Sequence, residues 1–598
     1  MRTVLALFCL LTLARIGHGD DRPNIVVFYT DDHGYADLSC QGVFQDVRTP
    51  NVDALAKNGV RALHGYSTAP QCVPSRAGLL IGKFQAKFGV ESNGKSLDGF
   101  DRELTIAERL QPAGYVTAQF GKWHLGAGPK ITEHGFKYVY NQNAQRPFAA
   151  NITTTGEDRP MGELNPDMYH VDACSHAAAS VIKRHKDDPF FLYVAYRAPH
   201  VPLDAPKKYL DRFPGKMPER RRQALAMLSA VDDGVGLVMK TLADNDLTKE
   251  TLVFYIGDNG APLKIHKLDA PGGGPGWDGS LNDPLNGEKG MLSEGGMHTP
   301  FVVSWPGKIP AGQEYPHPIS ALDVAATAAA IAGIETKSGD LDGVNLIPFL
   351  SGENSAAPHE ALMWRWISQS AIREGNWKLL RGGPREYLYN LEVDLEEKNN
   401  LAAKYPDIAN RLRGKLEQWS QELSPPGLAT EPQAATWNDY FDFYLDGKPA
   451  LPLREKFVPK DETESANANG PWLVRGGKLI ASTGLFDLVP DGKGKSEGAA
   501  LIRNGIKLDG PVTVEMEIKT SGAKDIGLAW RTSQDKTFTD ENRTSIKLAA
   551  SDDWQTVSAT IPSDDKIVHV RFQMPAGTTK INSLKLKPAS GKSVDLPK

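Results

Sequence analysis

Cysteine is scarce in this chain, with four residues among 598. Long apolar runs are missing too: beyond the N-terminal residues, no stretch approaches the ~20 apolar residues that a transmembrane helix needs. A membrane-spanning protein is therefore not expected. Neither sign of charge dominates, since 68 basic side chains stand against 73 acidic ones. This near-neutral balance gives no reason to expect nucleic acid as a partner.

The N-terminus has the composition of an export signal. The sequence predicts a secretory signal peptide over residues 1–19. This segment begins with a basic Arg2, continues with an apolar run from Val4 to Leu13, and ends in the small and polar residues Gly17-His18-Gly19. The alternative is a buried N-terminal helix. Export would place the chain in the bacterial periplasm or outside the cell.

Removal of this segment would take Cys9 with it and leave Cys40, Cys72 and Cys174. Cys40 and Cys174 could pair, but their spacing does not show whether they do. An odd cysteine in an exported protein is a candidate for a reactive or modified residue.

The chain is too long for a single hydrophobic core, so at least two domains are expected. Continuous apolar and β-branched runs predict buried strands, which is typical of a parallel sheet. These runs are 25–29, 190–194 and 252–256. Helices are indicated from Thr49-Pro50 onward and from Arg221 to Leu242. The fold class is therefore α/β, with a doubly wound sheet that binds ligands beyond the carboxyl ends of its strands.

The C-terminal part has a different pattern. From Val512 onward, alternating residues and short strand-like runs with little helical periodicity predict an appended β-sandwich of jelly-roll type over residues 455–590. Two roles remain open for it: structural support, or glycan binding through residues such as Trp472, Trp530 and Trp554. A Gly- and Pro-rich loop over 261–286 either shapes access to a site or is a plain linker.

Two predicted strands end in polar clusters, Asp31-Asp32 and Asp258-Asn259. Three carboxylates and an amide oxygen are the ligands that Ca²⁺ or Mg²⁺ prefers. Cys72 does not fit such a set as a thiol, because soft sulfur prefers Zn²⁺ or Cu(I). This mismatch suggests that the atom of residue 72 that binds the cation is not sulfur.

The run from Cys72 to Gly82, Cys-Val-Pro-Ser-Arg-Ala-Gly-Leu-Leu-Ile-Gly, resembles the signature of the type I sulfatases of the alkaline-phosphatase-like superfamily. Further segments match the same family, of the arylsulfatase or N-acetylgalactosamine-6-sulfatase type, in the expected order: Asp31-Asp32, Gly121 to Gly126, Pro199 to Pro202, Gly257 to Gly260, Gly287 to Gly290 and Glu294 to Gly296. The resemblance extends from about Arg22 to Ala402. It implies a catalytic domain over 22–350 with a mixed sheet, and a smaller α+β subdomain over 351–450.

The resemblance also implies roles for individual residues. Cys72 would be oxidised to formylglycine by a maturation enzyme, which makes that enzyme a partner. One Ca²⁺, with Mg²⁺ as the alternative, would be bound by Asp31, Asp32, Asp258, Asn259 and the modified Cys72. The hydrated aldehyde would supply the hydroxyl that attacks sulfur, and the cation would lower the pKa of that hydroxyl.

The remaining residues of the motifs would bind sulfate or move protons. Lys122 and Lys289 would neutralise the sulfate oxygens, and His200, with Lys289, would protonate the leaving alkoxide. His124 would remove the proton of the second hydroxyl and so expel sulfate. Arg76 would position the diol, and Ser75 would support the turn. His298 stands where many relatives carry arginine, so substrate preference would differ if that side chain faces the ligand.

The substrate implied by export and by the β-sandwich is a sulfated poly- or oligosaccharide. Two alternatives remain open. One is a phosphodiesterase or phosphonate hydrolase of the same superfamily, since phosphate and sulfate esters share tetrahedral geometry. The other is a non-catalytic binder of sulfated glycans.

Overall fold

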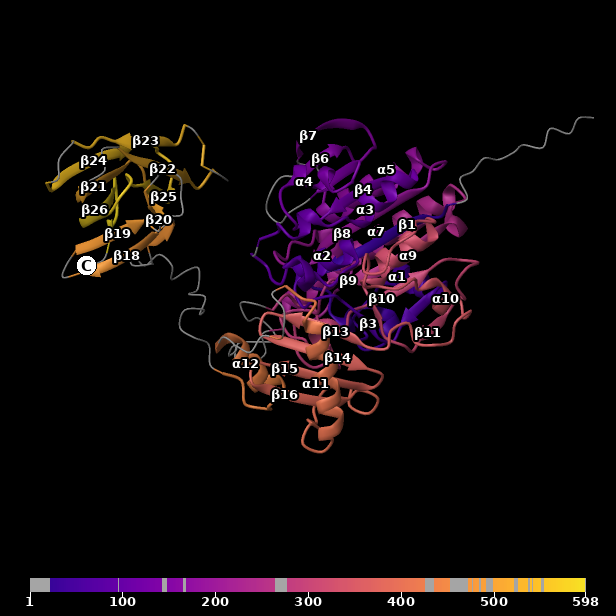
Figure 1. The fold of residues 1–598 in the computed structure, drawn as a ribbon. Helices are drawn as coiled ribbons and strands as arrows, with labels where there is room; N and C mark the ends of the chain where they lie inside the picture. The colour runs from indigo at the N-terminus through magenta and orange to yellow at the C-terminus, as the bar shows by residue number, and fades with distance from the viewer. Residues whose placement is uncertain are drawn as a thin grey trace, which may run out of the picture. The chain divides into compact units, whose positions relative to one another are not determined.

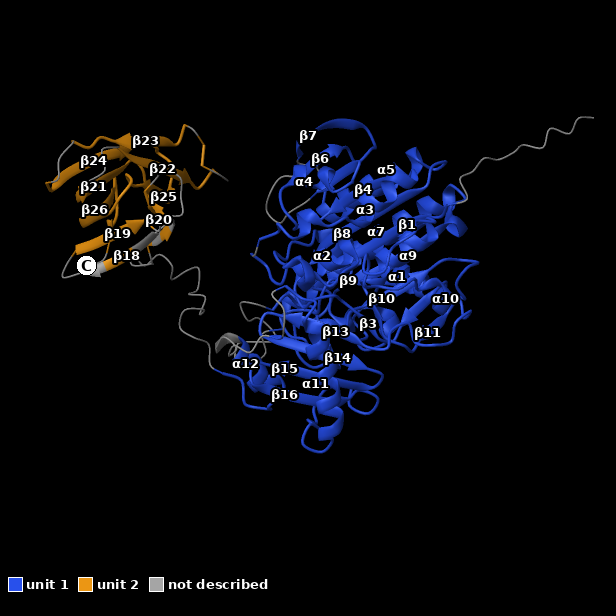
Figure 2. Cartoon of the chain, in the orientation of Figure 1, with its two compact units in different colours: residues 1–454 blue, residues 455–598 orange. Residues whose placement is uncertain are grey.

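The computed structural model describes residues 22–94, 96–141, 148–164, 168–263, 277–424, 428, 435–451, 472–475, 477–482, 485–490, 498–520, 525–535, 538–539, 541–549 and 553–596. The predicted signal peptide and Cys9 lie outside these residues, as does most of the Gly- and Pro-rich loop. The chain divides into two compact units, residues 1–454 and 455–598 (Figure 2). None of the helices within the described ranges combines the length and apolar character that crossing a lipid bilayer requires.

The first unit is built on a ten-stranded mixed sheet (Figure 1). Its strands, in spatial order, are β11 (Gln313–Tyr315), β2 (Val60–Ala62), β10 (Phe301–Ser304), β9 (Thr251–Gly257), β1 (Asn24–Asp31), β8 (Phe190–Pro199), β4 (Val116–Gly121), β5 (Tyr138–Asn141), β6 (Phe148–Ile152) and β7 (Asp158–Leu164). The central strands β9, β1, β8 and β4 run parallel to one another. They are buried along their whole length, as their continuous apolar runs predict.

Helices cover both faces of this sheet. One face packs against α1 (Pro50–Lys57), α5 (His170–Arg184) and α7 (Glu219–Asp244). The other face packs against α2 (Cys72–Ile81), α3 (Ile106–Leu110) and α9 (Asp323–Ile331). Alternate residues of β1 enter the two cores, with Val26 and Phe28 on one side and Val27 and Tyr29 on the other. The predicted doubly wound α/β class is thus confirmed.

A smaller antiparallel sheet follows within the first unit. It consists of β13 (Leu362–Trp366), β14 (Gln369–Glu374), β15 (Trp377–Gly382) and β16 (Arg385–Asn390). Helix α11 (Pro406–Ser420) packs on it, and α12 (Ala435–Tyr444) comes later. These elements fall in the segment 351–450, whose division from 22–350 remains a prediction.

The shorter elements of this unit connect the larger ones. They are α4 (Gly128–Glu133), α6 (Lys207–Leu210), α8 (Glu294–Met297), α10 (Ile347–Leu350), β3 (Gly65–Tyr66) and β12 (Ile319–Ser320). Cys40 and Cys174 are free thiols in this unit, so the pairing left open by their spacing is not formed.

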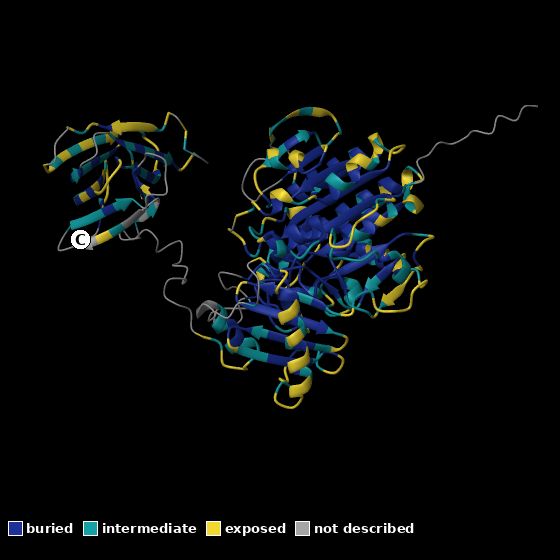
Figure 3. Ribbon diagram, viewed as in Figure 1, coloured by how far each residue is buried: buried dark blue, intermediate teal, exposed yellow. Residues whose placement is uncertain are grey.

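The second unit is a β-sandwich with its own core (Figure 3). One sheet has the order β17 (Leu473–Arg475), β20 (Ala500–Leu508), β25 (Ile567–Gln573), β22 (Ile526–Thr532) and β23 (Arg543–Ile546). The other has β18 (Gly477–Ser482), β19 (Leu485–Pro490), β26 (Thr579–Pro588), β21 (Val512–Thr520) and β24 (Gln555–Ile561), with β27 (Val594–Asp595) paired to β26. Residues of β21 alternate strictly between buried and half-buried, as the sequence predicts.

Candidate active site

The predicted site residues lie at one edge of the central sheet, where parallel strands end side by side. Asp31 is the last residue of β1, and Asp258 follows β9 directly. His200 follows β8, and Lys122 follows β4. Because these four strands are neighbours in the order β9, β1, β8, β4, their ends bring together side chains that are far apart in the sequence.

The backbone conformation orients the side chains of Lys122 and Asp32. Gly121 at the end of β4 has φ +85°, and a Cβ there would lie 2.1 Å from the Ala195 carbonyl oxygen. Only glycine therefore fits where the chain turns toward Lys122. Asp32 has φ 56°, an uncommon value for a residue with a side chain. Its backbone N–H donates to Oδ1 of Asp258 over 3.0 Å, which holds this conformation.

Cys72 is the first residue of α2 and is fully buried. Its Sγ lies 3.3 Å from Oδ1 of Asp31 and 3.2 Å from Nζ of Lys289. The N-terminus of this ten-residue helix carries partial positive charge at the position of Cys72. A negatively charged group beside Cys72 would therefore be stabilised.

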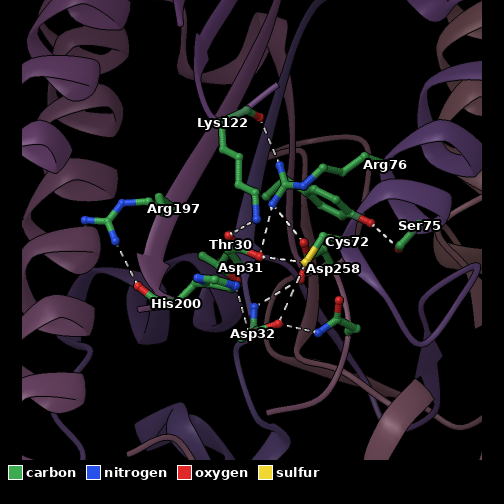
Figure 4. Close-up of polar contacts among 12 residues, drawn as sticks. Thr30, Asp31, Asp32, Cys72, Ser75, Arg76, Lys122, Arg197, His200 and Asp258 are labelled. Carbon is green, nitrogen blue, oxygen red and sulfur yellow. Dashed lines mark hydrogen bonds and ion pairs between the residues drawn. The ribbon is translucent and has the colours of Figure 1, made fainter. Parts of the chain in front are cut away.

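Each of the three carboxylates forms an ion pair with a basic side chain. Figure 4 shows two of these pairs, Lys122 with Asp31 and Arg76 with Asp258. Nζ of Lys122 lies 2.5 Å from Asp31, Nζ of Lys289 lies 2.6 Å from Asp32, and Nη2 of Arg76 lies 2.8 Å from Asp258. The site thus concentrates both signs of charge in a buried volume, where electrostatic interactions are strong.

These charges shift the pKa values of the site. Burial raises the pKa of Asp31, but Lys122 and the other cations outweigh it and hold that pKa well below its usual range. Burial, with Asp31 as a like charge, raises the pKa of Asp258 to about 7. Burial and Asp31 also raise the pKa of the Cys72 thiol above its ordinary value. An unmodified Cys72 is therefore a protonated thiol and a poor nucleophile.

The donor set fits a hard cation. Ligand atoms of Asp31, Asp32, Cys72 and His200 lie within 4.8 Å of one another. Oδ1 of Asn259 is buried and has no hydrogen-bond partner among the described residues, while its Nδ2 donates to Asp32 over 2.6 Å. A buried, unsatisfied amide oxygen beside converging carboxylates is suited to Ca²⁺. His200 joins the cluster geometrically, although it was not predicted as a ligand.

The two histidines differ in their surroundings. Nδ1 of His200 lies 2.7 Å from the Val201 carbonyl oxygen, and Nε2 lies 3.5 Å from Asp32. A carbonyl only accepts, so Nδ1 carries a proton and Nε2 is the atom that can exchange one within the site. Burial and the nearby Lys122 lower the pKa of His124 to about 3, so His124 is neutral. Neutral imidazole is the form that accepts a proton.

Arg76 connects several parts of the site and is completely buried. Besides Asp258, it donates from Nη1 to the Lys122 carbonyl oxygen over 3.0 Å. Its guanidinium also lies over the Tyr29 ring, 5.3 Å from the centroid. The hydroxyl of Tyr29 hydrogen-bonds Ser75 over 2.8 Å, which agrees with a supporting role for Ser75.

Two residues near the site were not predicted from the sequence. Asp278 is buried and accepts the N–H of Val201 over 3.4 Å, next to His200. Arg197 donates to the His200 carbonyl oxygen over 3.1 Å. Asp278 follows a Gly- and Pro-rich segment without periodicity, so only the fold reveals its position. Arg197 lies on the buried strand β8, where an arginine among apolar residues was a usable signal.

His298 does not face this cluster. It is buried, lies 3.1 Å from Glu294 through Nδ1, and packs against the Tyr66 ring at 5.2 Å between centroids. Its surroundings are those of a core side chain rather than of a ligand contact.

Comparison with known protein families gives two matches. Residues 23–334 match the model of the sulfatase family, and residues 287–422 match the C-terminal domain of N-sulphoglucosamine sulphohydrolase. Among characterised proteins, the N-acetylgalactosamine-6-O-sulfatase of Bacteroides thetaiotaomicron is 27% identical over 496 residues, which cover 67% of this chain and 94% of the relative. The N-acetylgalactosamine-6-sulfatase of Homo sapiens is 30% identical, covering 60% of this chain and 74% of the relative.

Solved structures share the fold of the first unit. The crystal structure of Ps i-CgsB in complex with k-i-k-neocarrahexaose has 29% identity and a TM-score of 0.60, covering 71% of this chain and 97% of that one. A phosphonate monoester hydrolase of Agrobacterium radiobacter has the same fold, with 20% identity and a TM-score of 0.51, covering 67% of this chain and 96% of that one.

Proposed function

We propose, from the premise that the chain belongs to the sulfatase family and is a sulfuric ester hydrolase, that it removes sulfate from a sulfated poly- or oligosaccharide with a nucleophile derived from Cys72. One observation carries the mechanism: Cys72 lies between a carboxylate, Asp31, and an ammonium group, Lys289, at a helix N-terminus. Conversion of the inert thiol to formylglycine replaces sulfur with oxygen, which suits the oxygen donors around it.

The cation site of this proposal consists of Asp31, Asp32, Asp258 and Asn259, together with the modified Cys72. A bound Ca²⁺, or Mg²⁺, would supply Lewis-acid stabilisation of negative charge and lower the pKa of a hydroxyl beside it. The converging carboxylates of Asp31 and Asp32, the contact of Asp258 with the Asp32 N–H, and the unsatisfied Oδ1 of Asn259 support this assignment. His200 contacts Asp32 but keeps a proton-transfer role, because its Nε2 faces the site.

The other residues bind the sulfate group and move protons. Lys122 and Lys289 offer ammonium groups to the sulfate oxygens, which places positive charge where negative charge develops. His200, when it is protonated on both ring nitrogens, donates the Nε2 proton to the leaving sugar oxygen, with Lys289 beside it, and the neutral His124 takes the proton that releases sulfate. Arg76 keeps Asp258 and the Lys122 backbone in place.

The substrate class is supported by the relatives. The B. thetaiotaomicron relative is named as an N-acetylgalactosamine-6-O-sulfatase, and Ps i-CgsB was solved in complex with k-i-k-neocarrahexaose. A signal peptide over residues 1–19 would export the enzyme to the periplasm or beyond, where such polymers are met. The maturation enzyme that oxidises Cys72 is a required partner in this proposal.

The decisive test compares matched esters on enzyme co-produced with a maturation enzyme. We expect turnover of an aryl sulfate to exceed that of the matching aryl phosphate and phosphonate by orders of magnitude. A screen of defined sulfated oligosaccharides, with released sulfate measured, would then identify the sugar and the sulfated position. Dominant phosphoesterase activity would contradict the proposal, and binding without any turnover would favour a non-catalytic glycan binder.

A further inference from the structure

The five-stranded sheet of the second unit carries arginine side chains on one face. Arg571 on β25 is paired with Ala529 on β22, and Ala529 is paired with Arg543 on β23. Two residue pairs along, Arg531 is paired with His569. Directly opposed residues of antiparallel strands point to the same face, so these basic side chains form one group. We call it the arginine face.

The buried residues of the same strands define which face this is. Leu528 and Trp530 on β22, and Val570 and Phe572 on β25, belong to the core of the sandwich. Side chains alternate along a strand, so Arg531, Ala529, Arg571 and His569 point away from that core. The arginine face is thus the outer face of its sheet.

A hollow of about 360 Å³ lies in the arginine face. It is lined by Gly527, Leu528, Ala529, Phe538, Arg543, Thr544, Arg571 and Gln573. Gly527 and Ala529 lack long side chains, which leaves room between the arginines of the two flanking strands. Since neighbouring strands are ~4.8 Å apart, the Cα atoms of Arg543 and Arg571 are separated by about 10 Å across β22.

Arg571 offers positive charge to a ligand in the hollow. Among the described residues, neither Arg531 nor Arg571 forms an ion pair, and Arg571 instead donates to the Gln573 side chain over 3.1 Å. None of the described residues that line the hollow is acidic. The hollow therefore offers the Arg571 guanidinium in a partly enclosed setting, where it binds anions better than in open water.

The hollow also contains groups that suit a sugar. Phe538 packs edge-on against His569, with ring centroids 4.8 Å apart, and lines the hollow. The Gln573 amide can accept and donate hydrogen bonds to hydroxyl groups. Guanidinium groups match the paired oxygens of a sulfate or carboxylate.

We propose that this hollow binds a sulfated sugar of a polysaccharide, as an anion-binding glycan site separate from the Cys72 centre. The occupant follows from charge complementarity, the aromatic ring and, in a step that rests on the proposed function, the sulfate esters that the first unit hydrolyses. Such a site would hold the polymer to the enzyme without taking part in the chemistry. The tryptophans singled out in the sequence are not its components: Trp530 is a core residue and Trp554 and Trp472 do not line the hollow.

The test uses the full-length protein in affinity electrophoresis through gels containing ι-carrageenan, chondroitin sulfate or heparin, each beside its desulfated counterpart. The double variant Arg543→Ala/Arg571→Ala is expected to bind at least one sulfated polymer about fivefold more weakly than the wild type. The matched control is Lys580→Ala/Lys585→Ala, which removes the same charge from exposed positions on β26 in the other sheet. This control should retain wild-type binding.

A second variant, Ala529→Gln, fills the hollow while keeping both arginines, and it should weaken binding as well. Thermal unfolding of each variant shows whether the second unit is still folded. Wild-type binding by the double variant and by Ala529→Gln, an equal loss in the lysine control, or equal affinity for a single-stranded oligonucleotide would overturn the proposal. Turnover of a small aryl sulfate should be unchanged in every variant, so failure of the catalytic proposal, seen as no turnover in the wild type, is separate from failure of the binding site.

Discussion

The Sγ atom of Cys72 lies 3.3 Å from the nearer carboxylate oxygen of Asp31, and both side chains are fully buried. Burial and this carboxylate raise the pKa of the thiol, so cysteine itself is kept protonated and unreactive. We therefore expect protein produced without a maturation enzyme to show turnover of aryl sulfates lower by about a thousandfold or more.

The same prediction has a chemical readout. Intact mass of the Cys72 peptide should show loss of sulfur and gain of oxygen in proportion to activity across preparations. Cys72→Ala should be inactive, while Cys40→Ala serves as the control, since Cys40 lies outside the site and should tolerate substitution. Full turnover by Cys72→Ala would rule out the mechanism.

Removal of the cation should inactivate and destabilise the first unit together. Asp31, Asp32 and Asp258 repel one another, and a bound divalent cation would offset that repulsion. After treatment with a chelator, we expect loss of turnover and a lower Tm, both restored by Ca²⁺. At a concentration 100 times its Kd, a ligand of the native state adds about 2.7 kcal/mol to the free energy of unfolding.

Asn259→Leu provides the matched variant for this experiment. It removes the unsatisfied Oδ1 while keeping a side chain of similar size. Calorimetric titration of the two metal-free proteins should show weaker Ca²⁺ binding by the variant. Equal affinities would show that Asn259 is not a ligand.

The strand ends of the site could be predicted from the sequence, because continuous apolar runs stop abruptly at Asp31-Asp32 and at Asp258-Asn259. The basic side chains that pair with these carboxylates could not be predicted from the sequence. The pairing of Arg76 with Asp258 joins residues 182 positions apart and depends on the strand order of the sheet. In the second unit, the strand pattern was predicted only from Val512 onward, and strands β17 to β20 precede it. In β20 a register irregularity between Asn504 and Leu508 interrupts the alternation.

Arg76→Lys should lower kcat more than it raises KM. Arg76 donates to Asp258 and to the Lys122 carbonyl oxygen with different nitrogens of one planar group, and a lysine cannot reproduce both contacts. Displacement of Asp258 and Lys122 would affect the transition state, so we expect kcat to fall about 100-fold. Steady-state kinetics on an aryl sulfate would measure it. Lys83→Arg, a charge-conserving change at a half-buried ion pair with Glu103, should leave kcat unchanged.

Glu397 should make stability depend on pH. Nζ of the buried Lys378 lies 2.7 Å from Glu294 and 2.9 Å from Glu397. Burial, opposed by Lys378, raises the pKa of Glu397 to about 7. The folded protein therefore binds a proton that the unfolded chain has already released above pH ~4.3. The stabilising contribution of Glu397 is complete below pH ~4.3 and is lost as the pH rises toward about 7.

Urea unfolding between pH 5 and 8 would measure this effect. Glu397→Gln removes the titrating proton and should flatten the decline over that range. Glu386→Gln, at a partly exposed position of the same sheet, is the control and should follow the wild-type curve. Parallel curves for Glu397→Gln and the wild type would exclude Glu397 as the source of the slope.

The roles of the two histidines can be separated by the leaving group. A general acid matters most when the departing oxygen is strongly basic, as in a sugar alkoxide, and least for an acidic nitrophenol. If Nε2 of His200 donates this proton, His200→Ala should reduce turnover of a sugar sulfate about 100-fold or more and that of a nitrophenyl sulfate far less.

His124 acts after the ester bond has broken, so His124→Ala should reduce the turnover of both substrates by a similar factor. A single-turnover measurement should then show release of the alcohol without release of sulfate in His124→Ala. If instead the leaving-group dependence belongs to His124→Ala, the two assignments must be exchanged, because the neutral His124 and the carboxylate-facing His200 would then have the opposite functions.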